Sequence, residues 1–326
     1  IQADGVIPGY NQVNLNDHSK WNGHFEGNNL ASNEDILNNQ VTINDGSIWN
    51  GNMEVSGNSV GTIYLNGGGK WNGNFEGSEI SLLGDNRSSI ALYSNSTWAG
   101  LVNSNAENGP EVRLESGSNW KMIGDSTIQT LSLDETSRVD FSDGSLRRAG
   151  GFSTLTIIDT LSGVAGAQIN LRTDLAQNIG DLLDVKGEVT GNFLVGVNNQ
   201  GSASVDPSKE LTIIKTGSSA EDAFALSNEV EVGGFKYMMK QEGTNWVLYS
   251  MDQSTVKSPL LTTAASGAIN TLSAGYLLNY SENESVLKRA GELREGTADR
   301  NVWGRIYGGE YSSAATGYVG SYEMDY

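Results

Sequence analysis

Residues 20–23 read Lys-Trp-Asn-Gly, and nearly the same four residues return as Ile-Trp-Asn-Gly at 48–51 and as Lys-Trp-Asn-Gly at 70–73. A degenerate copy, Thr-Trp-Ala-Gly, stands at 97–100, and Trp120 continues the series. Successive tryptophans are 28, 22, 27 and 22 residues apart. Repeats with a period of about 20–50 residues are typical of solenoids and propellers. The first part of the chain is therefore expected to be a stack of similar units.

Short β-prone runs separate the tryptophans, and each run ends in a turn signal. The runs stand at 40–43, 62–65, 89–93 and 111–114, and the first is followed by Asn-Asp-Gly at 44–46. No helical period appears, and a propeller blade needs nearer to about 40 residues. The chain has only four prolines in 326 residues, which suits a strand ladder because proline cannot donate to it. Residues 1–150 are therefore predicted to form the rungs of a parallel β-helix.

The charge of the chain excludes some classes of function. Lys and Arg number 20 against 39 Asp and Glu, so the formal net charge is −19. An acidic chain with no basic cluster repels phosphate backbones, and no nucleic-acid partner is expected. Cysteine is absent, which excludes thiol catalysis and cysteine metal sites. The chain contains no stretch of about 18 uninterrupted apolar residues, so no transmembrane helix is predicted.

The pattern changes in the second half of the chain. Apolar runs lengthen from 151 to about 252, where we expect a cap that covers the last rung and blocks its strand edge. A single helix is predicted over 258–294. Residues 302–311 return to an alternating strand rich in aromatic residues. The chain begins without an initiator Met or signal peptide, so Ile1 is interpreted as an internal position of a longer protein.

Several segments of this second half carry a family resemblance. They stand, in order, at 152–157, 167–171, 180–187, 189–192, 197–199, 211–216 and 245–248. Together they resemble the C-terminal passenger region of pertactin-like autotransporters, the surface proteins of type V secretion. Residues 286–294 resemble the linker helix of that family, and 302–309 resemble the opening of its outer-membrane barrel. Residues 1–150 match the family in style only.

The resemblance implies a fold and a division into four parts. The fold is a right-handed parallel β-helix with a C-terminal autochaperone cap, then a linker helix and the truncated first strands of a transmembrane β-barrel. The rungs take residues 1–150 and the cap takes 151–252. The helical linker, expected in the barrel lumen, takes 253–300, and the start of the barrel takes 301–326.

The resemblance also implies a function and a location. The passenger would be an adhesin or virulence factor, secreted through the periplasm of a Gram-negative bacterium and displayed from an outer-membrane barrel. Its expected partners are its own barrel, the barrel-assembly machinery, and either a host-surface receptor or copies of itself on other cells. Some family members release the passenger at an Asn-Asn pair in the helix, but residues 279–285 contain no such pair. This passenger is therefore predicted to stay attached.

The sequence offers little catalytic chemistry. His18 and His24 are the only histidines; a metal site would need further ligands, and two surface histidines do not predict one. Residues 124–126 read Gly-Asp-Ser, as in some serine proteases, but Thr and Ile follow in place of Gly and Ser, and no histidine is placed for a triad. We predict no enzyme activity, no catalytic, metal-binding or cofactor-binding residue, and no cofactor.

Two alternatives stay open at this point. Parallel β-helices also host polysaccharide lyases and hydrolases, whose acidic residues share one face of the solenoid. Candidates for such a face are Glu107, Glu111, Asp125, Asp140 and Asp143. The tryptophans either stack on sugars or stack on successive rungs, where they pack the solenoid or cover its turn glycines. Their regular spacing favours the structural role.

Overall fold

The computed structural model describes residues 2–4, 10–29, 36–78, 87–104, 109–141, 151–253, 258–295, 310–313 and 322–325. The chain divides into two compact units. The solenoid unit consists of Ile1–Val230 and Met238–Tyr249, and the helical unit consists of Glu231–Tyr237 and Ser250–Tyr326. The predicted segment 302–309 lies outside the described residues. Two of the candidate acidic residues, Glu107 and Asp143, lie outside them as well.

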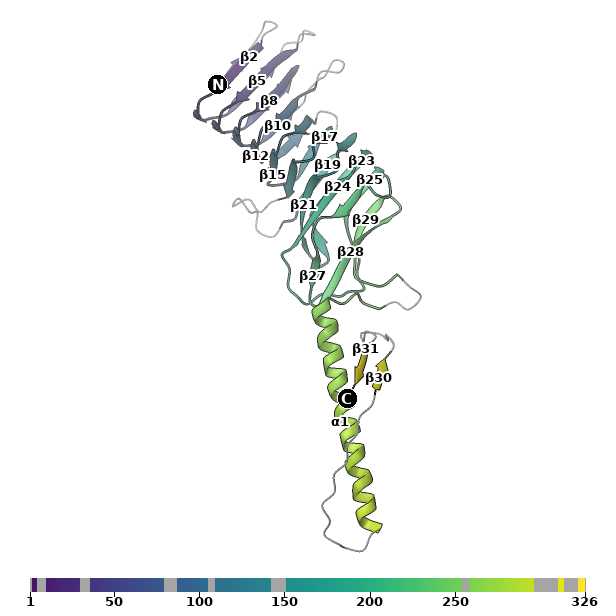
Figure 1. Ribbon diagram of the computed structural model, residues 1–326. Coiled ribbons are helices and arrows are strands. Elements are labelled where there is room, and N and C mark those ends of the chain that lie inside the picture. The colour runs from purple at the N-terminus through teal and green to yellow at the C-terminus, as the bar shows by residue number, and fades with distance from the viewer. Residues whose placement is uncertain are drawn as a thin grey trace. The chain divides into compact units, whose positions relative to one another are not determined.

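The solenoid unit is built from three sheets whose strands come from successive coils (Figure 1). Sheet A has the order β1 (Gln2–Asp4), β4 (Phe25–Asn29), β7 (Met53–Gly57), β10 (Phe75–Ser78) and β13 (Val102–Ser104). Sheet C has the order β26 (Phe224–Leu226), β24 (Phe193–Asn199), β21 (Ala167–Asp174), β18 (Arg138–Phe141), β15 (Asn119–Met122), β12 (Thr97–Gly100), β9 (Lys70–Asn72), β6 (Ile48–Asn50) and β3 (Lys20–Asn22), with β22 (Ile179–Gly180) beside β21.

Sheet B is the longest of the three and has 14 strands. Its path runs β2 (Tyr10–Leu15), β5 (Leu37–Ile43), β8 (Ser59–Leu65), β11 (Ser89–Leu92), β14 (Glu111–Leu114), β17 (Thr130–Leu133), β20 (Thr160–Gly163), β23 (Leu182–Thr190), β25 (Leu211–Ser218), β29 (Asn245–Tyr249), β28 (Phe235–Glu242) and β27 (Val230–Val232). The pair β16 (Ser126–Ile128) and β19 (Thr154–Ile157) lies off this path. Each early coil thus adds one strand to sheets B, C and A in turn, and the predicted parallel β-helix is confirmed.

The hydrophobic pattern of the strands explains why they stack in this register. In β5 the inward residues alternate with outward ones, the two-residue period of a half-buried strand. Val41 pairs with Ile63 on β8, and Ile63 pairs with Ile90 on β11. All three side chains are fully buried. A shift by one residue would move these side chains to the solvent face, so burial fixes the register.

The turns between sheets B and C explain the Asn, Asp and Gly content of the repeats. Two consecutive residues adopt left-handed backbone angles in these turns, as Asp45 and Gly46 do with φ of 51° and 68°. Asp17 and His18 take the same positions one coil earlier, with φ of 56° and 61°. Asn, Asp and Gly tolerate this conformation better than other residues. The predicted turns are therefore confirmed.

The tryptophans form one continuous stack inside the solenoid. Trp21, Trp49, Trp71, Trp98 and Trp120 are in register on sheet C, with ring centroids 4.4–5.2 Å apart and planes within 10° of parallel. The last four are fully buried. The structural role expected for these tryptophans is confirmed, but they lie in strands rather than in turns. They therefore pack the core and are closed to sugars at the four buried positions.

A glycine stands two residues after each of the first four tryptophans and accepts a hydrogen bond from the indole of the next coil. Trp71 Nε1 donates a hydrogen bond of 2.8 Å to the carbonyl oxygen of Gly51, and Trp98 Nε1 donates one of 2.9 Å to that of Gly73. Each indole thus bonds to the glycine of the coil before it. The same contact repeats for Trp49 with Gly23. These bonds satisfy a buried N–H that would otherwise cost about 1–3 kcal/mol.

We expect Gly73→Ala to lower the free energy of unfolding by about 3 kcal/mol, since overpacking against rigid neighbours is destabilising. A Cβ at this position would lie 1.9 Å from the carbonyl oxygen of Gly51 and 2.8 Å from Trp71 Nε1. Gly151→Ala is the matched control, because a Cβ there meets no atom within 4 Å. Urea unfolding followed by circular dichroism compares the two variants. Equal stability would contradict the close stacking of the coils.

The parallel ladder ends in antiparallel strands. Strand β23 still pairs in parallel with β25, but β25 pairs antiparallel with β29, and β29 antiparallel with β28. The aromatic series continues here, since Phe193 stacks on Phe224 and Trp246 meets Phe224 edge-on at 5.2 Å. We call residues 151–249 of the solenoid unit the terminal region.

The helical unit contains α1 (Thr263–Glu295), and the predicted start of this helix at residue 258 is wrong. Residues 258–262 form short strand-like contacts instead. Leu260 N donates to the Ser250 carbonyl at 2.6 Å, and Thr262 N donates to that of Gly234 at 2.9 Å. Thr262 then caps the helix, since its Oγ1 accepts a bond from Ala265 N at 3.1 Å.

The same unit holds a two-stranded antiparallel sheet of β30 (Glu310–Ser313) and β31 (Tyr322–Asp325). Glu310 pairs with Asp325 in its register. The predicted strand over 302–311 is therefore seen only from Glu310 on, because residues 302–309 lie outside the described part.

Candidate binding surfaces

The outer face of sheet A carries a row of acidic side chains. Glu26, Glu54 and Glu76 are in register on β4, β7 and β10, and Asn103 follows them on β13. Strands in a sheet lie about 4.8 Å apart, so these carboxylates are neighbours. Asn103 Nδ2 donates to Glu76 at 2.7 Å. The row gives this face a negative charge.

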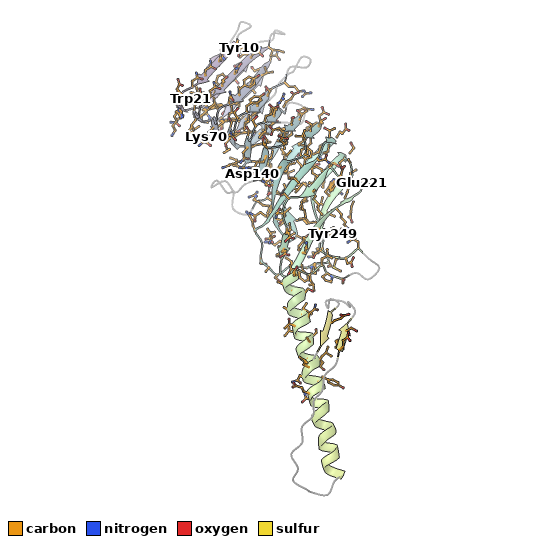
Figure 2. The ribbon with its side chains drawn as sticks, in the orientation of Figure 1. Tyr10, Trp21, Lys70, Asp140, Glu221 and Tyr249 are labelled. Carbon is orange, nitrogen blue, oxygen red and sulfur yellow. The ribbon has the colours of Figure 1, made fainter. Side chains whose placement is uncertain are left out.

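The outer face of sheet C carries amides and cations. Asn22, Asn50 and Asn72 form a ladder in which each side-chain amide donates to the one before, at 2.7 and 2.8 Å. Lys20 and Lys70 stand two residues before the first and last of these. Figure 2 shows Lys70 on the same side of the solenoid as Trp21. The two faces thus differ in the sign of their charge.

The outer face of sheet B carries no charge in its first four strands. Strands β2, β5, β8 and β11 contain no Asp, Glu, Lys or Arg, although these residues make up 18% of the chain. The first charged residues appear on β14, where Glu111 and Arg113 point outward. The early coils therefore present an acidic, a basic and a neutral face.

The two histidines lie in separate positions. His18 is an exposed turn residue, and His24 follows β3, where its Nδ1 accepts a bond from Asn52 N at 3.2 Å and lies 3.9 Å from Glu54 Oε1. Within the described part of the chain, no group of three or more His, Asp or Glu side chains is placed to hold a metal ion. Both histidines are exposed, as the sequence predicts.

The Gly-Asp-Ser segment is a structural turn. Ser126 is 2% exposed, and its hydroxyl accepts a bond from Val102 N at 3.1 Å and donates one to the Gly124 carbonyl at 3.2 Å. Asp125 accepts a bond from Thr154 N at 2.8 Å. A buried hydroxyl that already accepts one hydrogen bond and donates another is not available to attack a substrate.

The three described acidic residues considered for carbohydrate catalysis do not share one face. Glu111 lies on the outer face of sheet B, Asp125 lies in the turn before β16, and Asp140 lies on β18 of sheet C. Asp140 accepts bonds from Asn119 at 2.8 Å and Asn170 at 2.6 Å and pairs with Arg138 at 3.2 Å. Its contacts are those of a surface ladder.

The terminal region is held by a buried ion pair that the sequence did not indicate. The Asp181 carboxylate is fully buried, and it accepts bonds from Arg172 Nε at 2.9 Å and Arg172 Nη2 at 2.8 Å. Two backbone groups, Ser153 N and Arg172 N, donate to it at 2.7 Å each. These bonds join three separate chain segments, so Asp181 acts as a clamp.

Two further side chains secure the end of the solenoid. Asn228 imitates a strand residue, since its amide donates to the Val197 carbonyl and its Oδ1 accepts from Val197 N, each at 2.9 Å. Lys240 pairs with Glu210 at 2.8 Å and Glu242 at 2.5 Å. Burial alone would lower the pKa of Lys240, but its bonds to Glu210 and Glu242 outweigh burial and raise the pKa above its ordinary value.

In the part of the chain that the structure describes, no helix is both long and apolar enough to cross a membrane.

Comparisons with known proteins agree with this geometry. Residues 128–250 match the family model described as Pertactin. The probable autotransporter YcgV of Escherichia coli K12 is 34% identical over an alignment of 271 residues, and the match covers 72% of this chain and 27% of that protein. The autotransporter adhesin/invasin TibA of Escherichia coli O78:H11 is 28% identical over 191 residues, 58% of this chain and 19% of that protein.

Two more distant matches complete these findings. An immunoglobulin A1 protease autotransporter of Haemophilus influenzae is 28% identical over 144 residues, 43% of this chain and 8% of that protein. The solved structure of the Haemophilus influenzae Hap adhesin has a TM-score of 0.51 at 22% identity, and the match covers 73% of this chain and 24% of that one. That likeness shows the fold alone.

Stacked parallel coils that end in antiparallel strands define the fold as a parallel β-helix. The chain belongs to the pertactin-like autotransporters, of which it is a passenger region. It spans about a quarter of the length of the YcgV relative.

Proposed function

We propose that the chain is the surface-displayed passenger region of a Gram-negative autotransporter and acts as an adhesin. The observation that carries the proposal is the likeness to a relative named as an adhesin/invasin, over 58% of this chain. Long solenoid faces with outward ladders of amides and charges suit adhesion, because they offer many weak contacts in a row. The absence of catalysis stays a prediction, and no observation favours the carbohydrate-enzyme alternative.

Adherence tests this proposal. The complete gene, expressed in a non-adherent Gram-negative host, is expected to raise binding to epithelial cells several-fold. The matched control is the same gene without the codons for residues 1–252, which keeps the helix and everything after it. Equal adherence of the two strains, with the longer product present at the surface, would refute the adhesin.

We also propose that residues 151–252 are an autochaperone cap on a right-handed solenoid. The Asp181 clamp, the Asn228 contact and the antiparallel strands support a segment that is stable by itself. In a solenoid each coil contacts only its neighbours, so one stable end can template the others. Folding outside the cell would then hinder the chain from sliding back.

Deletion of residues 151–252 tests the cap. The remaining coils of 1–150 are expected to become sensitive to protease within minutes, because their last rung is uncovered. The control deletes residues 10–36, which span one coil at the other end, and should leave the remaining coils protected. Protection of 1–150 without the cap would refute the autochaperone.

The helix and the last strands complete the proposed topology. We place α1 in the lumen of a barrel that begins at about residue 301 and includes β30 and β31. Polar side chains along α1 support a wet surrounding, since Thr271, Asn279 and Asn283 are exposed on the helix. The passenger stays attached, because residues 279–285 lack an Asn-Asn pair.

The proposed partners follow from this topology. They are the protein's own outer-membrane barrel, the barrel-assembly machinery, and a host-surface receptor or copies of the passenger on neighbouring cells. The product would pass through the periplasm and remain at the outer membrane.

A further inference from the structure

Among the described residues of the early coils, the neutral face of sheet B carries exposed aromatic rings that sheets A and C do not. Tyr10 and Tyr64 are exposed there by 58% and 37%, whereas the buried tryptophans of the solenoid are closed to solvent. Figure 2 shows Tyr10 at the N-terminal end of the unit. Tyr10 lies on β2 and Tyr64 on β8, so one strand, β5, runs between them.

The register places the two tyrosines at opposite corners of a patch. Tyr64 pairs with Thr42, which pairs with Asn14, four residues after Tyr10 on the same strand. Two strand spacings and four residues along a strand correspond to roughly 16 Å across the diagonal. The column between the two corners holds Gln12, Gln40 and Thr62, each in register with the next.

The side chains between the tyrosines are held in place by one another. Gln40 Nε2 donates to Thr42 Oγ1 at 3.0 Å, and Gln12 Nε2 donates to Asn14 Oδ1 at 3.1 Å. The Tyr10 hydroxyl donates to Gln40 Oε1. Side chains fixed in this way lose less freedom when a ligand binds. The patch is therefore a flat, ordered array of amides and hydroxyls between two aromatic rings.

We infer that this neutral patch binds an uncharged oligosaccharide. Sugar rings have apolar C–H faces that stack on aromatic rings, and their hydroxyls match amides and hydroxyls, which both donate and accept. Strands β2, β5, β8 and β11 carry no charged side chain that would attract an ionic partner. Charged partners would instead be attracted to the charged rows on sheets A and C. The inference rests on the proposed adhesin function and names its ligand class.

Titration of the purified 326-residue chain with neutral hexasaccharides of glucose, galactose, mannose and N-acetylglucosamine tests the inference. At least one is expected to bind with a Kd of about 0.1–1 mM. Tyr64→Ala and Tyr10→Ala should each weaken that binding about tenfold. Tyr64→Phe keeps the ring and should bind nearly as the parent does. Both positions are exposed, so the variants should fold and unfold as the parent does.

Tyr276→Ala is the matched control, because Tyr276 is 72% exposed but lies on α1. An acidic heparin hexasaccharide is the comparison ligand and should bind more weakly than the best neutral one. The inference is overturned if no neutral hexasaccharide binds at about 10 mM, if the heparin fragment binds tighter, or if both tyrosine variants bind as the control does. Adherent cells that carry Tyr64→Ala and keep full adherence would refute the glycan while leaving the adhesin intact.

Discussion

Trp71→Ala is expected to lower the free energy of unfolding of the solenoid by about 3–5 kcal/mol. The ring is fully buried and stacks on Trp49 at 5.2 Å and on Trp98 at 4.9 Å. Truncation would open a cavity between two coils and leave the Gly51 carbonyl without its indole partner. Urea unfolding followed by far-ultraviolet circular dichroism measures the loss without relying on tryptophan emission.

Two variants show whether the loss comes from the stack. Trp71→Phe keeps an aromatic ring and should cost about 1–2 kcal/mol, because it forfeits one hydrogen bond and some volume. Tyr276→Ala removes a ring that is 72% exposed and should change stability by less than about 0.5 kcal/mol. If Trp71→Ala were no worse than Tyr276→Ala, the tryptophan stack would contribute nothing to the fold.

Asp181→Asn is expected to destabilise the terminal region by about 3–5 kcal/mol, since removal of one partner leaves a buried charge unpaired. The Arg172 side chain is only 11% exposed, so water cannot replace the lost carboxylate. The measurement is the free energy of unfolding, together with the rate of proteolysis at residues 151–249.

Asp184→Asn is the matched control for the clamp. Asp184 pairs with Lys186 at 2.6 Å, but the lysine side chain is 55% exposed. Surface ion pairs contribute at most about 1 kcal/mol. A clamp variant that is as stable as this control would show that Asp181 does not hold the terminal region together.

The sequence predicted the solenoid well because its information is local and repeated. Trp21, Trp49 and Trp71 recur with the same neighbours, and turns such as 44–46 need residues that tolerate left-handed backbone angles. The family resemblance predicted a pertactin-like passenger, which the match over 128–250 confirms.

Other features depend on contacts between distant segments. Leu260 and Leu261 fit a helical period, but residues 258–262 pair with 234–236 and 250–252, and these tertiary contacts override helix propensity. Asp181 and Arg172 stand nine residues apart in strand-rich sequence with no signal that joins them. The neutral patch also emerged only from the register, because Tyr10 and Tyr64 are far apart in the sequence.

Surface labelling tests the central claim, which is that the solenoid lies outside the cell while α1 lies within a barrel. The chain has no cysteine, so single variants Asn38→Cys on β5 and Leu272→Cys on α1 report one position each. Both side chains are exposed, and Leu272 by 75%. The probe is a maleimide on a polymer too large to enter the lumen, applied to intact cells that express the complete gene. The account predicts labelling of Asn38→Cys at once and of Leu272→Cys only after denaturation. Labelling of Leu272→Cys on intact cells, or none of Asn38→Cys, would contradict it.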